Sequence, residues 1–247
     1  MNRFAHPAFA PYLEFIKLTA GDDQIASLNK LAAQREICHA HTGKPLSFTA
    51  ADKPASACSY EQTIADTGII PSREKNLHDY LNALVWLRFP HLKSAINLRH
   101  CQMLAQSESE RRQRGALRDW LTLLDENGLL VATPNKKLLD LLRDKQWAEL
   151  FWNARQDVVQ DMRFVVIGHG LLEKCLSPFS GMTAKCLFLR TGQTTPEALD
   201  GEAARIVEST KPFEMPPLPV QGIPGWSNNE SLETYLDTRV FRPPRTP

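Results

Sequence analysis

Two apolar patterns of helical spacing, separated by a proline, constrain the middle of this chain most strongly. The first consists of Leu77, Leu81, Leu84 and Val85, and the second of Leu92, Ala95, Ile96 and Met103. Residues three or four apart share one helix face, so each pattern predicts an amphipathic helix. Pro90 lacks a backbone N–H and disfavours a helical residue before it, so the first helix ends there. The chain is expected to turn between two consecutive helices within residues 68–100.

Each of these predicted helices carries a row of polar side chains. On the first, His78 and Asn82 share a face, and Asp79 lines up with Asn82. On the second, Lys93 and Asn97 are four residues apart. These residues are candidates for one functional cleft.

A further pair of polar residues follows a predicted buried strand at 162–167. Gly168 separates this strand from a short predicted helix that begins near His169 and contains Glu173 one turn later. Binding groups are common where strands lead into helices. His169 and Glu173 are therefore candidates for the same cleft.

The remaining pattern predicts a helix-rich α+β fold with a small sheet. Two apolar runs around the Asp-Glu-Asn-Gly sequence at 125–128 predict a β-hairpin over 120–133. Strands are expected near 163–167 and 184–190, and one long helix at about 135–157.

The chain length of 247 residues fits one domain. We expect an N-terminal helical cover and loop at 1–67, with a short strand near Leu46, and a core at 68–211. Residues 212–247 hold eight of the 17 prolines, which favours an extended wrap pinned by side chains such as Phe213 and Leu218.

Charge and hydropathy exclude some classes of partner. Lys and Arg total 29 against 28 Asp and Glu, so the net charge of +1 does not favour nucleic-acid binding. No apolar run approaches the roughly 18–20 residues of a membrane span, and Pro11 and Glu14 interrupt any signal-peptide core. We expect a cytoplasmic protein without a membrane partner.

The five cysteines include no Cys-x-x-Cys pair, which argues against a disulfide framework or a zinc knuckle. Cys38, His39 and His41 lie close enough together to suggest a metal, but no spaced second pair accompanies them, so isolated loop residues are the favoured interpretation. The basic segment at 106–119 is typical of a solvated helix face, with phosphate binding by Arg118 as the alternative.

Three segments and the tail resemble an uncharacterised proteobacterial family, domain of unknown function 3025. The segments are HDYLNALVWLRFPHLKSAIN at 78–97, RDWLTLLDENG at 118–128 and GHGLLEKCLSPFSGMTAK at 168–185, with GIPGW at 222–226. This resemblance implies no established activity. The polar positions that recur in the family fall here on His78, Asp79, Asn82, Lys93, Asn97, Asp119, Asp125, Glu126, His169 and Glu173.

The first functional hypothesis is a hydrolase-like enzyme, either assisted by a divalent metal or working without one. The catalytic candidates are His78, Asp79, His169 and Glu173, and the Asp125–Glu126 pair could add further ligands, with a bound water as nucleophile. Without a metal, either histidine beside a carboxylate could act as a general base. The sequence lacks HExxH, GxSxG, GxGxxG and Walker motifs, so no reaction follows from a motif.

The second hypothesis is a non-catalytic protein that binds a small anion, a nucleotide or a peptide. Its ligand-binding candidates are Asn82, Lys93, Asn97, Arg118, Asp125 and Glu126. The third hypothesis is structural, in which these polar residues cap helices and fix loops.

Overall fold

The computed structural model describes the backbone of residues 3–21, 23–51, 57–104 and 111–244. The helices are η1 (Pro7–Tyr12), α1 (Leu13–Leu18), α2 (Gln24–Gln34), α3 (Ala57–Thr67), α4 (Leu77–Arg88), α5 (Pro90–Leu104), α6 (Arg111–Asn127), α7 (Lys136–Arg143), η3 (Glu149–Asn153), α8 (Arg155–Asp161), α9 (His169–Lys174), α10 (Pro196–Ser209), η4 (Val220–Gly222) and α11 (Leu232–Leu236). The strands are β1 (Ser47–Ala50), β2 (Ile69–Ser72), β3 (Gly128–Ala132), β4 (Arg163–Val166), β5 (Thr183–Leu189) and β6 (Pro217–Pro219). This confirms the helix-rich α+β class.

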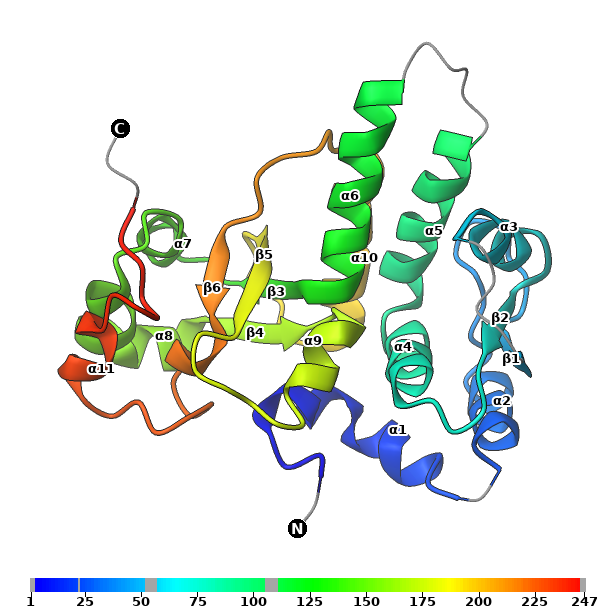
Figure 1. The fold of residues 1–247 in the computed structure, drawn as a ribbon, viewed down its shortest axis with the longest axis horizontal. Coiled ribbons are helices and arrows are strands. Elements are labelled where there is room, and N and C mark those ends of the chain that lie inside the picture. The colour runs from blue at the N-terminus through cyan, green and yellow to red at the C-terminus, as the bar shows by residue number, and fades with distance from the viewer. Residues whose placement is uncertain (1–2, 22, 52–56, 105–110, 245–247) are drawn as a thin grey trace.

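The larger sheet has the strand order β4-β3-β5-β6. β3 is antiparallel to β4 and parallel to β5, and β6 is antiparallel to β5 (Figure 1). Every residue of β3 is buried, as expected for a central strand with both faces covered. The strands predicted near 163–167 and 184–190 are therefore confirmed as β4 and β5.

The predicted hairpin at 120–133 is wrong. Residues 120–127 continue helix α6, and β3 begins only at Gly128. Trp120, Leu121 and Leu124 are buried at helical spacing, so their packing outweighs the turn preference of the Asp-Glu-Asn-Gly sequence. As a result, Asp125 and Glu126 lie in the last turn of a helix.

The single long helix predicted at 135–157 is also wrong. α7 ends before Lys145, which has a positive φ of 53°, and the chain then forms the π-helical turn η3 and the separate helix α8. The left-handed conformation at a helix end usually falls on glycine. Here it falls on a lysine, so the sequence carries no stop signal.

A second, two-stranded sheet lies at the opposite end of the molecule from α7 and α11 (Figure 1). β1 and β2 are parallel, and α3 connects them. The strand expected near Leu46 is confirmed as β1, whereas β2 was not predicted.

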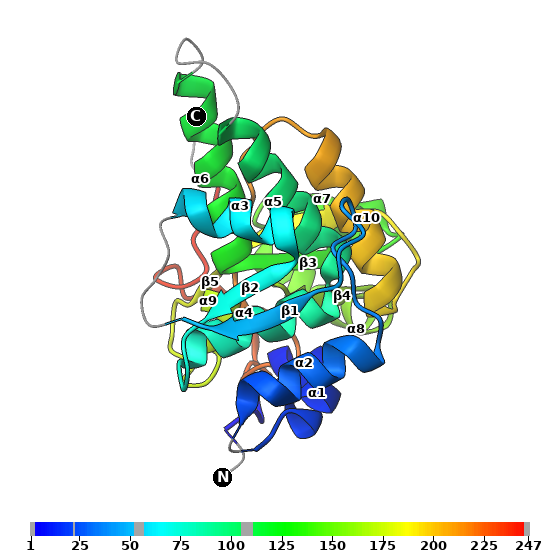
Figure 2. The ribbon, with the colours of Figure 1, turned by 90° about the vertical axis from the view of Figure 1, so that its right-hand side faces the viewer.

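Helix α5 lies among other helices, in contact with α3, α6 and α10. Figure 2 shows α6 and α10 on opposite sides of it. The buried carboxylate of Asp200 on α10 accepts hydrogen bonds from the backbone N–H of His91 and Leu92, at 2.9 and 2.7 Å. It therefore caps the start of α5 from another part of the chain.

The two ends of the chain pack onto the core. Near the N-terminus, the buried hydroxyl of Tyr12 donates to the carbonyl of Val166, at 2.6 Å. In the tail, Leu218 is buried where β6 pairs with β5. Phe213 is 40% exposed, so it is not one of the buried anchors.

Within the described residues, no helix combines the length and the apolar character needed to cross a membrane.

Candidate metal centre

Helix α4 places His78 in its first turn. The side chain of Asn76 accepts a hydrogen bond from the backbone N–H of Asp79, at 3.0 Å, and so caps the helix start. α4 packs against α9, which carries His169 and Glu173. Segments about ninety residues apart in sequence are thereby brought together.

Two glycines allow α9 to approach the end of α6 closely. A Cβ at Gly168 would come within 2.4 Å of the backbone nitrogen of Gly128, and a Cβ at Gly170 within 2.4 Å of Glu126 Oε2. The N–H groups of Ile167 and Gly168 both donate to the carbonyl of Gly128, at 3.0 Å. The Gly-His-Gly sequence therefore holds His169 beside the last turn of α6.

Three potential metal ligands meet at this junction. His169 Nε2 lies 3.0 Å from His78 Nε2 and 3.4 Å from Glu126 Oε1, and His78 Nε2 lies 3.8 Å from the same carboxylate oxygen. The side chains of His78 and Glu126 are 34% and 37% exposed, whereas that of His169 is 6% exposed. The centre is thus a partly open site with one buried ligand. Among the described residues, these three form the only group of His, Cys, Asp and Glu side chains close enough to hold one metal ion.

Each imidazole has a carboxylate near its second nitrogen. His78 Nδ1 is 2.9 Å from Glu173 Oε2. His169 Nδ1 is 3.8 Å from Asp125 Oδ2, and within the described part of the chain this buried nitrogen has no hydrogen-bond partner. A carboxylate behind each histidine is the usual outer arrangement of a protein metal site.

The two acids of α6 have shifted pKa values. The hydrogen bond with His169 lowers the pKa of Glu126, which keeps this carboxyl ionised. Burial raises the pKa of Asp125, but the charge and hydrogen bond of Lys93, together with the charges of His169 and His100, outweigh burial, so the net shift is downward.

A buried polar network continues behind Asp125. Lys93 is 4% exposed and donates to Asp125 and to Asn82 Oδ1, the latter at 2.9 Å. Asn82 in turn donates to the hydroxyl of Tyr60, at 2.9 Å. The ammonium of Lys93 also lies over the ring of Trp86.

Asn97 belongs to a neighbouring part of this interior. It donates to Glu61 Oε2 at 2.6 Å, and its Oδ1 lies 3.0 Å from His39 Nε2. Burial raises the pKa of Glu61 to about 7. Tyr60 and Glu61 were not predicted from the sequence, because no polar pattern on their helix distinguishes them.

The structure brings together seven of the residues singled out from the sequence. They are His78, Asn82, Lys93, Asp125, Glu126, His169 and Glu173. Asp79 lies apart, in an ion pair with Arg73 at 2.7 Å. Arg118 is exposed beside Asp119, and the side chains of 106–114 in the same basic segment lie outside the described residues.

The histidines near Cys38 do not form a metal site with it. His39 contacts Asn97, and His41 lies 3.2 Å from Glu208. The Cys38 thiol is directed to the carbonyl of Glu36. The three side chains therefore have separate partners.

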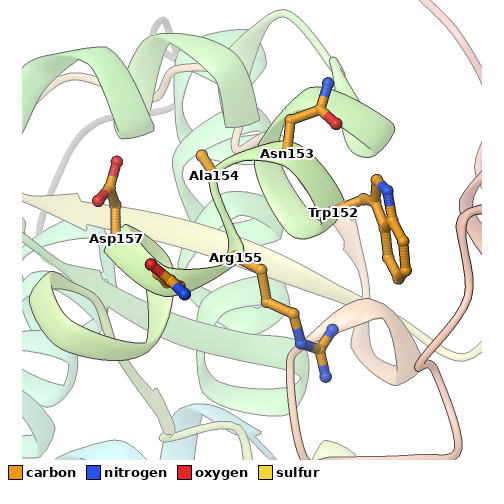
Figure 3. A pocket seen from close by; sticks show the side chains of 6 residues that line it. Trp152, Asn153, Ala154, Arg155 and Asp157 are labelled. Carbon is orange, nitrogen blue, oxygen red and sulfur yellow. The ribbon is translucent and has the colours of Figure 1, made fainter.

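Two surface hollows lie elsewhere. One of about 340 Å³ follows the π-helical turn at 152–157, where Arg155 points away toward the C-terminal segment and donates to Asn229 and Tyr235 (Figure 3). The other, of about 710 Å³, lies between the N-terminal helices and the start of α4, and Asp79 and Tyr80 line it. Neither is lined by the three potential ligands.

The fold and this site define a helix-rich α+β protein with two histidines and one carboxylate at a helix junction. The chain belongs to the family described as protein of unknown function (DUF3025), which matches residues 46–245 and so includes all three potential ligands. No curated protein and no solved structure matches the chain significantly.

Proposed function

We propose that this protein is a metal-dependent hydrolase whose ion is held by His78, His169 and Glu126. The convergence of these three side chains carries the proposal. Two imidazoles and one carboxylate are the donor set of several hydrolytic zinc sites, in which the remaining position takes water.

The separations of the three ligand atoms support this assignment. The ligand atoms are 3.0, 3.4 and 3.8 Å apart. The point in their plane that is equidistant from all three lies about 2.0 Å from each, which matches Zn–N and Zn–O bond lengths. Because His78 and Glu126 are partly exposed, solvent reaches the site from their side. A bound divalent ion would supply an activated water and polarise a substrate oxygen.

The surrounding charges favour a cation. Glu126, Glu173 and Asp125 contribute three carboxylates, and the ammonium of Lys93 offsets one of these charges. An imidazole binds a metal ion through a ring nitrogen that carries no proton.

Non-catalytic anion binding has less support. Lys93 already donates to Asp125 and Asn82, and Arg118 lies beside Asp119 away from the centre. A bound anion would have to compete with Asp125 for Lys93 and with Asp119 for Arg118.

We also propose a cytoplasmic location. Cys38, Cys101, Cys175 and Cys186 carry free thiols, which suits a reducing compartment.

The proposal is tested with purified protein, a set of divalent ions and chromogenic carboxylic and phosphoric esters. We expect hydrolysis that requires one bound ion and falls at least about 100-fold in His78→Gln, by analogy with the loss of a catalytic group. His41→Gln is the matched control, because His41 is also a partly exposed histidine beside a glutamate. Stoichiometric ion binding without hydrolysis of any ester, or a strict preference for redox-active iron, would contradict the hydrolase assignment.

A further inference from the structure

A buried ion pair lies directly behind one ligand of the metal centre. Lys93 on α5 and Asp125 on α6 contact each other, and their side chains are 4% and 22% exposed. Asn82 holds the same ammonium at 2.9 Å and is itself held by Tyr60. Four helices, α3 to α6, thus contribute to fixing one carboxylate.

Stability alone does not explain this pair. Taking two charges out of water is costly, and apolar residues of similar volume often serve as well or better in a core. Trp86 lies beneath the ammonium of Lys93, and Leu92 and Ile96 are buried on the same helix. A buried lysine here needs another role.

The role concerns His169, which lies beside Asp125. An imidazole that binds a metal through Nε2 carries its proton on Nδ1, and this N–H needs an acceptor. For His78 the acceptor is Glu173, at 2.9 Å. For His169 the candidate acceptor is Asp125, whose Oδ2 lies 3.8 Å from Nδ1. This nitrogen is buried and has no hydrogen-bond partner among the residues described.

We propose that Asp125, held in place by Lys93 and Asn82, is the positioning residue that fixes His169 for metal binding through Nε2. This inference rests on the metal centre of the proposed function. Asp125 does not touch the ion. Its Oδ2 lies 3.8 Å from His169 Nδ1 in this structure, and on metal binding it would accept the Nδ1–H and so direct the lone pair of Nε2 toward His78 and Glu126. The buried network of Lys93, Asn82 and Asp125 thereby raises the affinity of His78, His169 and Glu126 for the metal ion.

The first test replaces the pair as a unit, with Lys93→Met and Asp125→Leu combined, so that no lone charge remains buried. We expect the double variant to fold and to bind Zn²⁺ about 10- to 100-fold more weakly, as for the loss of an outer hydrogen-bond partner. The matched control is Arg88→Met combined with Glu197→Leu, which removes an ion pair between the end of α4 and α10, ten residues along α4 from His78. The control is expected to keep the affinity of the natural protein within about twofold, because distant changes act independently.

The second test uses the natural protein and does not depend on folding of a variant. Nitrogen-15 NMR of the zinc-bound protein should show His169 protonated at Nδ1 and metal-bound at Nε2. Metal binding of His169 through Nδ1, or an unchanged zinc affinity in the double variant, overturns the role of Asp125 and leaves the metal centre intact. Absence of zinc binding by the natural protein overturns the metal centre itself, so the two failures are distinguishable.

Discussion

A single methyl group at Gly170 should weaken the metal centre. Gly170 lies in the first turn of α9, and a Cβ there would come within 2.4 Å of Glu126 Oε2 and 3.1 Å of the Glu126 backbone oxygen. The first separation is too short for any real contact, so the Glu126 side chain must move. In Gly170→Ala the third ligand is therefore displaced from the two histidines, while the backbone contact needs only a small adjustment.

The size of this effect follows from linkage. An ion present at a thousand times its dissociation constant stabilises the folded protein by about 4 kcal/mol. A 100-fold weaker affinity removes about 2.7 kcal/mol of that stabilisation. For a protein of this length, each kcal/mol corresponds to about 2–4 °C in Tm, so the zinc-induced rise in Tm should shrink by about 5–10 °C.

The assay is thermal unfolding with and without Zn²⁺. Gly201→Ala is the control, because Gly201 also lies in a helix but has nothing within 4 Å of the added Cβ. The control should gain up to about 1 kcal/mol from helix propensity and keep the full zinc effect. If Gly170→Ala shows the same zinc-induced rise as the natural protein, Glu126 is not a ligand.

Three further changes test the packing and the buried acids. Gly168→Ala forces a Cβ against the backbone of residues 126–128, at 2.4–2.6 Å, and should cost at least about 1–3 kcal/mol in urea unfolding; an unchanged midpoint would refute the close approach of α9 to α6. Asp200→Ala leaves two backbone N–H groups at the start of α5 without their acceptor and should cost about 1–3 kcal/mol, whereas the exposed Glu197→Ala should stay within about 0.5 kcal/mol. Because burial raises the pKa of Glu61 to about 7, the folded state binds the extra proton, and this contribution to stability is present below pH 4.5 and lost as the pH rises to 7. Relative to Glu61→Gln, the natural protein should lose about 1–3 kcal/mol over that range; parallel stability curves would show that Glu61 titrates normally.

Local periodicity was sufficient to predict several elements. Helices α4 and α5 and strands β4 and β5 follow from apolar spacing and from the proline at position 90. The hairpin predicted around 120–128 was wrong, because its turn-forming residues lie in the last turn of α6 and Gly128 begins β3. Glycine directly after a helix is a common stop signal, so the same residues are equally compatible with a helix end.

The candidate site was predictable in part. His78, His169 and Glu173 were grouped from their positions on a helix face and at a strand end, and they meet in the structure. Asp79 was grouped with them, but its side chain forms an ion pair with Arg73. Adjacent helix residues point about 100° apart, so Asp79 and His78 face different directions. Glu61 could not be found, because its environment depends on how α3 packs against α5.

The most direct measurement is a titration of the purified, chelator-treated protein with Zn²⁺ and Co²⁺, followed by calorimetry and by the visible spectrum of bound cobalt. We expect one ion per chain, a cobalt spectrum typical of nitrogen and oxygen ligands in low coordination, and loss of tight binding in His169→Gln with the fold retained. Failure of every divalent ion to bind stoichiometrically or to raise the Tm would contradict the metal centre formed by His78, His169 and Glu126.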